Sequence, residues 1–154
     1  MDSQRIRDEL ETAFRGPSWH GPALREVLEG ITAEQAFARP VAGAHSIAEL
    51  VSHLRAWKAI VRRRVEGEAP RRMSDAEDWP QPGPGPAGWA GLLADLEEEH
   101  RRLVAVASSL APEALSRPLA DETVASSLIG AAHHDLYHGG QIALLRKARG
   151  RAAG

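Results

Sequence analysis

Apolar residues recur at helical spacing in four long stretches of the chain. Ser46 and Glu49 have the spacing of a capping box at the start of the second stretch, and Gly16-Pro17 ends the first. In the third stretch the apolar residues return every three or four positions, which places them on one face of a helix. The four predicted helices cover residues 2–14, 46–67, 87–110 and 122–147.

Two shorter helical turns are predicted between the first and second long helices. Pro22 suits the first turn of one of them, and Leu24 and Leu28 belong to its apolar side. Thr32 and Gln35 have capping-box spacing and begin the other. No segment alternates apolar and polar residues with the period of two that a half-buried strand shows, so no strand is predicted.

The segment between the second and third long helices is rich in proline. Residues 68–88 contain five of the ten prolines of the chain. Because proline lacks the N–H that a helix interior needs, this segment is predicted to be an extended crossover. Its length would let the third helix run parallel to the second. The whole pattern predicts an all-α four-helix bundle, with residues 1–154 as a single domain.

Composition narrows the chemistry of the chain. The formal net charge of -2 gives no basic excess for binding nucleic acid. The absence of cysteine excludes disulfides and zinc–thiolate sites, so a transition-metal site would have to use histidine and carboxylate ligands. No apolar run approaches the length of a membrane span, and the charged N-terminus has no secretory apolar region. We therefore expect a cytoplasmic protein that binds neither nucleic acid nor membrane.

Two histidines in the last predicted helix are the first candidates for chemistry. His134 and His138 are one helical turn apart and project from the same face, where they could hold one divalent metal ion. His133 points about 100° away from His134 around the helix. The spacing alone also fits two buried histidines that are hydrogen-bonded to their neighbours.

A catalytic three-ligand site needs a further residue from a facing helix. The apolar faces of the second and third long helices offer His53 and His100, and His100 lies closer to the middle of its face. Either could instead be a core histidine with a hydrogen-bond partner. Glu97 and His100 have the Glu-x-x-His spacing of di-iron bundles, but such sites need two of these motifs and the chain has one.

Three segments together resemble the DinB/YfiT-like superfamily, and the similarity extends over nearly the whole chain. They are Trp19-His20-Gly21-Pro22, the stretch from His45 to Leu54, and His134-Asp135-Leu136-Tyr137-His138-Gly139-Gly140-Gln141-Ile142. The resemblance implies a bundle with a long connection between its second and third helices, which is often a homodimer. It also implies a metal held by His53, His134 and His138.

Three neutral imidazoles leave a bound Zn²⁺ or Ni²⁺ with its full charge, which acidifies a coordinated water or thiol. Gln141 and Asp135 are the candidates to orient the imidazoles through their second nitrogens. Trp57, one turn from His53, could wall the pocket. His20 and Tyr137 are weaker candidates for its rim.

Relatives in this superfamily include thiol transferases that use bacillithiol, mycothiol or glutathione, and a thiol-dependent isomerase. The resemblance therefore implies a metal-dependent thiol S-transferase that joins a low-molecular-weight thiol to a small electrophile. One alternative is a metal-dependent hydrolase, although no glutamate stands beside the histidines as in His-Glu-x-x-His enzymes. Another is a non-enzymatic, stress-associated binding protein with a structural or vestigial metal site.

Overall fold

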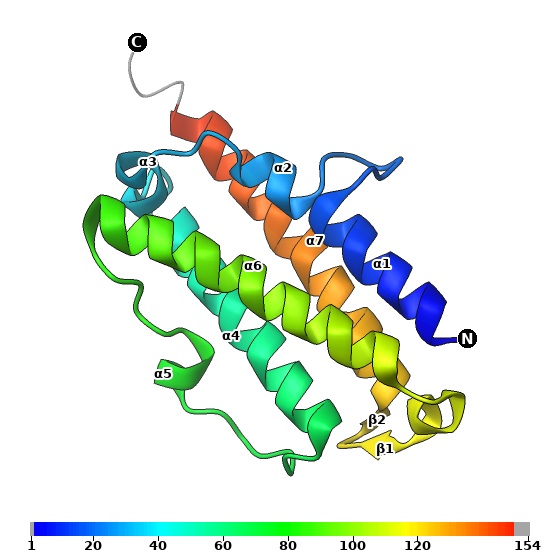
Figure 1. Cartoon of the computed structure of the whole chain (residues 1–154). Coiled ribbons are helices and arrows are strands. Elements are labelled where there is room, and N and C mark those ends of the chain that lie inside the picture. The colour runs from blue at the N-terminus through cyan, green and yellow to red at the C-terminus, as the bar shows by residue number, and fades with distance from the viewer. Residues whose placement is uncertain (1, 150–154) are drawn as a thin grey trace.

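Long helices dominate the computed structural model, which describes residues 2–149 (Figure 1). The two ends of the predicted domain, Met1 and residues 150–154, lie outside the described residues. None of the described helices has the length and hydropathy needed to cross a membrane. The α-helices are α1 (Ser3–Arg15), α2 (Leu24–Leu28), α3 (Ala33–Phe37), α4 (Ile47–Glu66), α5 (Asp75–Asp78), α6 (Gly85–Ser109) and α7 (Val124–Arg149). A 3₁₀-helix, η1 (Pro112–Ser116), and two strands, β1 (Pro118–Leu119) and β2 (Glu122–Thr123), connect α6 to α7.

The four long helices form the predicted all-α bundle. Helix α4 packs against α6 and α7, and α1 packs against the same two helices from the other side. Helices α4 and α6 run in one direction, while α1 and α7 run in the opposite one (Figure 1). The segment between α4 and α6 is therefore the long crossover that the sequence predicts.

The core is divided along its length by a layer of buried polar side chains. One apolar cluster contains Leu54 of α4 and Leu96 of α6, and a second contains Leu103 of α6. Between them on α4 and α6 lie the buried side chains of Lys58 and His100. Helix α7 repeats the arrangement, with Asp135 between Leu128 and Ile142.

Part of the prediction for the crossover is wrong, because residues 75–78 form the short helix α5 instead of an extended chain. A local capping box accounts for it: the Ser74 hydroxyl accepts a hydrogen bond from the Glu77 N–H, and the Glu77 carboxylate accepts one from the Ser74 N–H. The third long helix also begins slightly earlier than predicted, at Gly85. Pro86 fits there because the first turn of a helix needs no proline N–H.

The prediction of no strand is also wrong. Strands β1 and β2 pair antiparallel through Pro118–Thr123 and Leu119–Glu122, and α7 consequently begins at Val124 instead of Glu122. With two residues each, the strands are too short to produce a periodic signal. The Thr123 hydroxyl accepts a hydrogen bond from the Ser126 N–H and satisfies a donor at the start of α7.

Candidate metal centre

The side chains of His53, His134 and His138 converge between α4 and α7. The Nε2 atom of His134 lies 3.1 Å from His53 Nε2 and 2.9 Å from His138 Nε2. The three residues form a group that could hold a metal ion, with one nitrogen from each within 4.8 Å of the others. Helix α7 contributes two of the three candidate ligands because residues one turn apart share a face, and α4 contributes the third across the seam.

The outer nitrogens of two of these rings are fixed by hydrogen bonds. His53 Nδ1 lies 2.7 Å from the carbonyl oxygen of Asp78, and His138 Nδ1 lies 2.6 Å from Oε1 of Gln141. Because oxygen acceptors of this kind carry no proton, each Nδ1 must be the donor. In their neutral forms, His53 and His138 therefore present unprotonated Nε2 atoms to His134.

This tautomer pattern fits a bound cation. His134 Nε2 can carry one proton and so can satisfy only one of the two lone pairs that face it. A metal ion accepts all three lone pairs at once. Tetrahedral ligands at the usual Zn–N distance of about 2.0–2.1 Å would have their nitrogens about 3.3 Å apart, close to the spacing in this group.

Burial favours the metal-binding form of all three histidines. It is the main cause that lowers the pKa of each ring, and it lowers that of His134 to about 3, with further contributions from His138 and His53. His100, the rival third ligand, also has a lowered pKa, about 2, mainly because of burial. At neutral pH these imidazoles are uncharged, as metal ligation requires.

We expect the metal-free protein to lose stability as the pH falls below about 6.5, the ordinary pKa of histidine in an unfolded chain. Below that pH the unfolded chain takes up protons that native His134 and His100 reject until about pH 3 and 2. Each such histidine should lower the free energy of unfolding by about 1.4 kcal/mol per pH unit. Urea unfolding between pH 7.5 and 5.5 measures the slope. A flat profile would contradict the buried neutral state.

The crossover supplies part of the wall around His53, and this contribution is missing from the sequence-based prediction. The indole of Trp79 lies between two imidazoles, 3.9 Å from the His53 ring and 3.7 Å from the His45 ring, nearly parallel to both. The Asp78 carboxylate accepts a hydrogen bond from Trp57 Nε1 at 2.6 Å. Residues of the crossover therefore fix both the tautomer and the ring plane of His53.

The predicted orienting role of Gln141 agrees with its contact to His138. Replacing Gln141 by leucine removes the acceptor for the His138 Nδ1 proton, so we expect zinc affinity to fall by about 10- to 100-fold. Gln141→Glu keeps an acceptor there and should retain affinity. Competition with a chromophoric chelator measures both variants. Equal zinc affinity in Gln141→Leu and the unmodified protein would exclude this role.

Asp135, the other predicted orienting residue, has a different partner. Its Oδ2 atom lies 2.5 Å from the Lys58 ammonium, and both side chains are buried. Lys58 Nζ also lies 3.4 Å from His100 Nδ1. The sequence contains a signal that could have revealed this pair. Lys58 lies at helical spacing between Leu54 and Val65, so its charge falls on the buried face of the helix.

The other predicted candidates are spread around the protein. His100 is completely buried and stacks on Phe14 at 3.8 Å, away from the three-histidine group. His20 is exposed and contacts Trp19. Tyr137 is 65% exposed and lies with His138 in a cavity of about 500 Å³. Trp57 lines a different cavity, together with His134.

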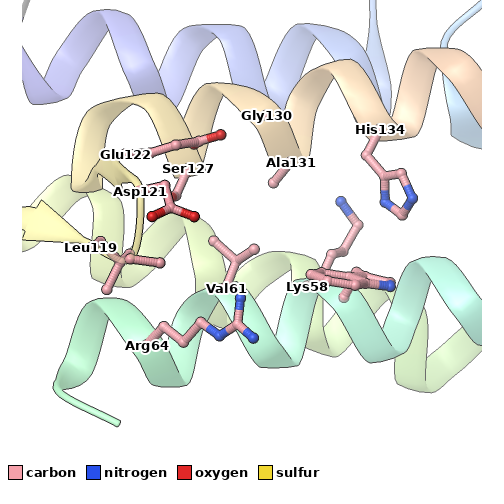
Figure 2. A pocket seen from close by; sticks show the side chains of 12 residues that line it. Lys58, Val61, Arg64, Leu119, Asp121, Glu122, Ser127, Gly130, Ala131 and His134 are labelled. Carbon is pink, nitrogen blue, oxygen red and sulfur yellow. The ribbon is translucent and has the colours of Figure 1, made fainter. Parts of the chain in front are cut away.

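This second cavity, which we call the seam cavity, has a volume of about 410 Å³ and lies between α4, α7 and the β1–β2 turn (Figure 2). Lys58 and His134 lie at one end of it, which we call the inner end (Figure 2), and the Trp57 ring lies 6.2 Å from that of His134. It extends towards the first turns of α7, whereas the cavity at Tyr137 and His138 extends towards the later turns. The histidine group is therefore positioned between two spaces of the size that small ligands occupy.

The fold and the site together define an all-α bundle with a three-histidine group that could hold a metal ion. The chain belongs to the DinB superfamily, whose family model matches residues 18–142. The matched region includes all three histidines and the crossover. No curated protein and no solved structure matches the chain.

Proposed function

We propose that this protein is a metal-dependent transferase that joins a low-molecular-weight thiol to a small electrophile. The observation that carries the proposal is the convergence of three Nε2 atoms beside an open cavity. In this proposal His53, His134 and His138 hold a divalent ion, zinc or nickel, and leave a coordination position free. Membership of the DinB superfamily supports the assignment of a metal ion to these three histidines.

A divalent ion in this site would favour the thiolate form of a bound thiol, which is the nucleophilic form. The protein contributes orientation and exclusion of water. Trp57 and Trp79 shield the ring of His53 on two sides, and their edge and face contacts limit its rotation. In the transfer itself, a sulfur–carbon bond forms, the leaving group departs with its electron pair, and the thiol proton passes to solvent.

The positions of Asp78 and Asp135 favour a thiol over water as the nucleophile, because neither carboxylate is placed to act as a general base. Asp78 faces the outer nitrogen of His53, at 3.3 Å, and Asp135 is engaged by Lys58. Neither is placed beside the three Nε2 atoms, where a general base would act on a bound water. A thiol needs less help, because it ionises more readily than water.

The test uses protein loaded in turn with zinc and nickel, a panel of thiols that includes glutathione, bacillithiol and mycothiol, and 1-chloro-2,4-dinitrobenzene as a chromogenic electrophile. We expect thiol-dependent release of chloride and formation of the thioether, lost in His134→Ala and kept in His133→Ala. Turnover of p-nitrophenyl acetate without thiol would favour the hydrolase. A loaded protein that is inactive in both assays would favour the non-enzymatic alternative.

A further inference from the structure

The outer end of the seam cavity carries opposite charges on its two walls. Arg64 projects from α4, and Asp121 of the β1–β2 turn and Glu122 of β2 lie on the other side (Figure 2). The inner end differs, because Lys58 is neutralised by Asp135. The unpaired charge that faces the cavity therefore comes from Arg64, Asp121 and Glu122, and not from Lys58.

No ion pair within the described part of the chain occupies these three charged residues. Among the described residues, neither Asp121 nor Glu122 forms an ion pair, and Arg64 has no carboxylate partner. Arg64 instead donates a hydrogen bond to the Arg71 carbonyl at 3.1 Å and lies over the Trp57 ring at 5.8 Å. Both contacts hold its guanidinium on the cavity wall while leaving its charge uncompensated.

Apolar side chains separate this charged end from the metal centre. Val61 and Ala131 line the cavity between its two ends (Figure 2). The helical rise between Ser127, near the charged end, and His134, at the inner end, corresponds to about 10 Å. A ligand that reaches from the histidines to the charged end must therefore have a slim body about this long.

We propose that the seam cavity binds an amphoteric thiol, with its sulfur at the histidine group and an α-amino-acid group at the charged end. The ammonium group of the ligand is placed against Asp121 and Glu122, and its carboxylate against Arg64. This arrangement satisfies both signs of charge, as a purely cationic or purely anionic end group would not. The inference rests on the proposed function for the sulfur and adds the recognition of the other end.

Three probes of equal length isolate the end group: N-(γ-glutamyl)cysteamine, N-(4-aminobutanoyl)cysteamine and N-glutarylcysteamine. They carry an amino-acid group, an ammonium alone and a carboxylate alone. Thiolate binding to cobalt-substituted protein is followed by its sulfur-to-cobalt absorption band, which does not depend on turnover. We expect the γ-glutamyl probe to bind at least about fivefold more tightly than either of the others.

Two sets of variants should remove the preference in opposite ways. Arg64→Met keeps the packing on Trp57 and should bring the γ-glutamyl and aminobutanoyl probes to equal affinity. Asp121→Asn combined with Glu122→Gln should instead equalise the γ-glutamyl and glutaryl probes. Glu113→Gln, an exposed change outside the cavity, is the matched control and should leave all three affinities unchanged.

The outcomes separate the two proposals. Equal affinity of the three probes for the unmodified protein would overturn the end-group assignment while the thiol-binding function stands. A cobalt-loaded protein that shows no thiolate band with any probe would overturn the proposed function and, with it, this inference. A preference that persists in both sets of variants would place the end group outside the seam cavity and overturn the assignment.

Discussion

His134→Ala should reduce the affinity for zinc by more than about 100-fold. Loss of a residue that only orients a ligand costs up to about 100-fold in metal affinity, and loss of the ligand itself should cost more. His134 is the central member of the group, because its Nε2 atom lies within hydrogen-bond distance of Nε2 in both His53 and His138. Its loss leaves two imidazoles, one from each helix. His53→Ala and His138→Ala should have effects of the same order, because each removes one of three ligands.

Metal content after dialysis against zinc, measured by elemental analysis, tests this expectation: about one ion per chain for the unmodified protein and little in the three variants. His133→Ala is the matched control, because His133 is exposed and adjacent to His134 on the same helix. His100→Ala tests the rival ligand. If His100→Ala lost its zinc while His53→Ala kept it, the assignment of the third ligand would be wrong.

Asp135→Leu should lower the free energy of unfolding by about 3–5 kcal/mol, since it leaves the Lys58 ammonium buried without its carboxylate. This is a large share of the roughly 5–15 kcal/mol that stabilises a typical domain. Lys58→Met should lower the free energy of unfolding by a similar amount, because it leaves the Asp135 carboxylate without its counter-ion at a position where burial raises its pKa. Urea unfolding at pH 7.5 measures both variants.

The double variant Lys58→Met/Asp135→Leu separates charge from packing. With both charges removed, stability should return to within about 1 kcal/mol of the unmodified protein, because buried ion pairs and apolar replacements often contribute similarly. A double variant as unstable as either single one would show that the shape of these side chains matters more than their charge. Zinc binding should survive in the double variant, because neither residue hydrogen-bonds His53, His134 or His138.

Much of the bundle follows from local patterns. The Ser46 capping box begins α4 as predicted, with the Ser46 hydroxyl and the Glu49 carboxylate each accepting a backbone N–H. The i,i+4 spacing of His134 and His138 places both on the side of α7 that faces His53, where His138 is buried and His134 is half-buried. These predictions succeed because capping and helical periodicity act between residues within one or two turns.

Helical spacing alone did not identify the third residue of the candidate site. Helical periodicity left His53 and His100 as alternatives, and the family resemblance favoured His53. The structure brings His53 to the pair on α7 and places His100 against Phe14. That distinction depends on how two helices are rotated about their axes, which is set by packing along their whole contact. The spacing of residues within one helix does not report this rotation.

Local interactions were enough to predict the four long helices, the long crossover and the histidine pair on α7, because each of these depends on residues that are near neighbours in the chain. Which buried polar groups meet, in contrast, depends on the packing of the helices against one another. Trp79 reaches His53 from a proline-rich crossover, and Lys58 meets Asp135 across the bundle. Contacts of this kind join residues far apart in the chain, so they depend on how complete helices pack and not on any local pattern.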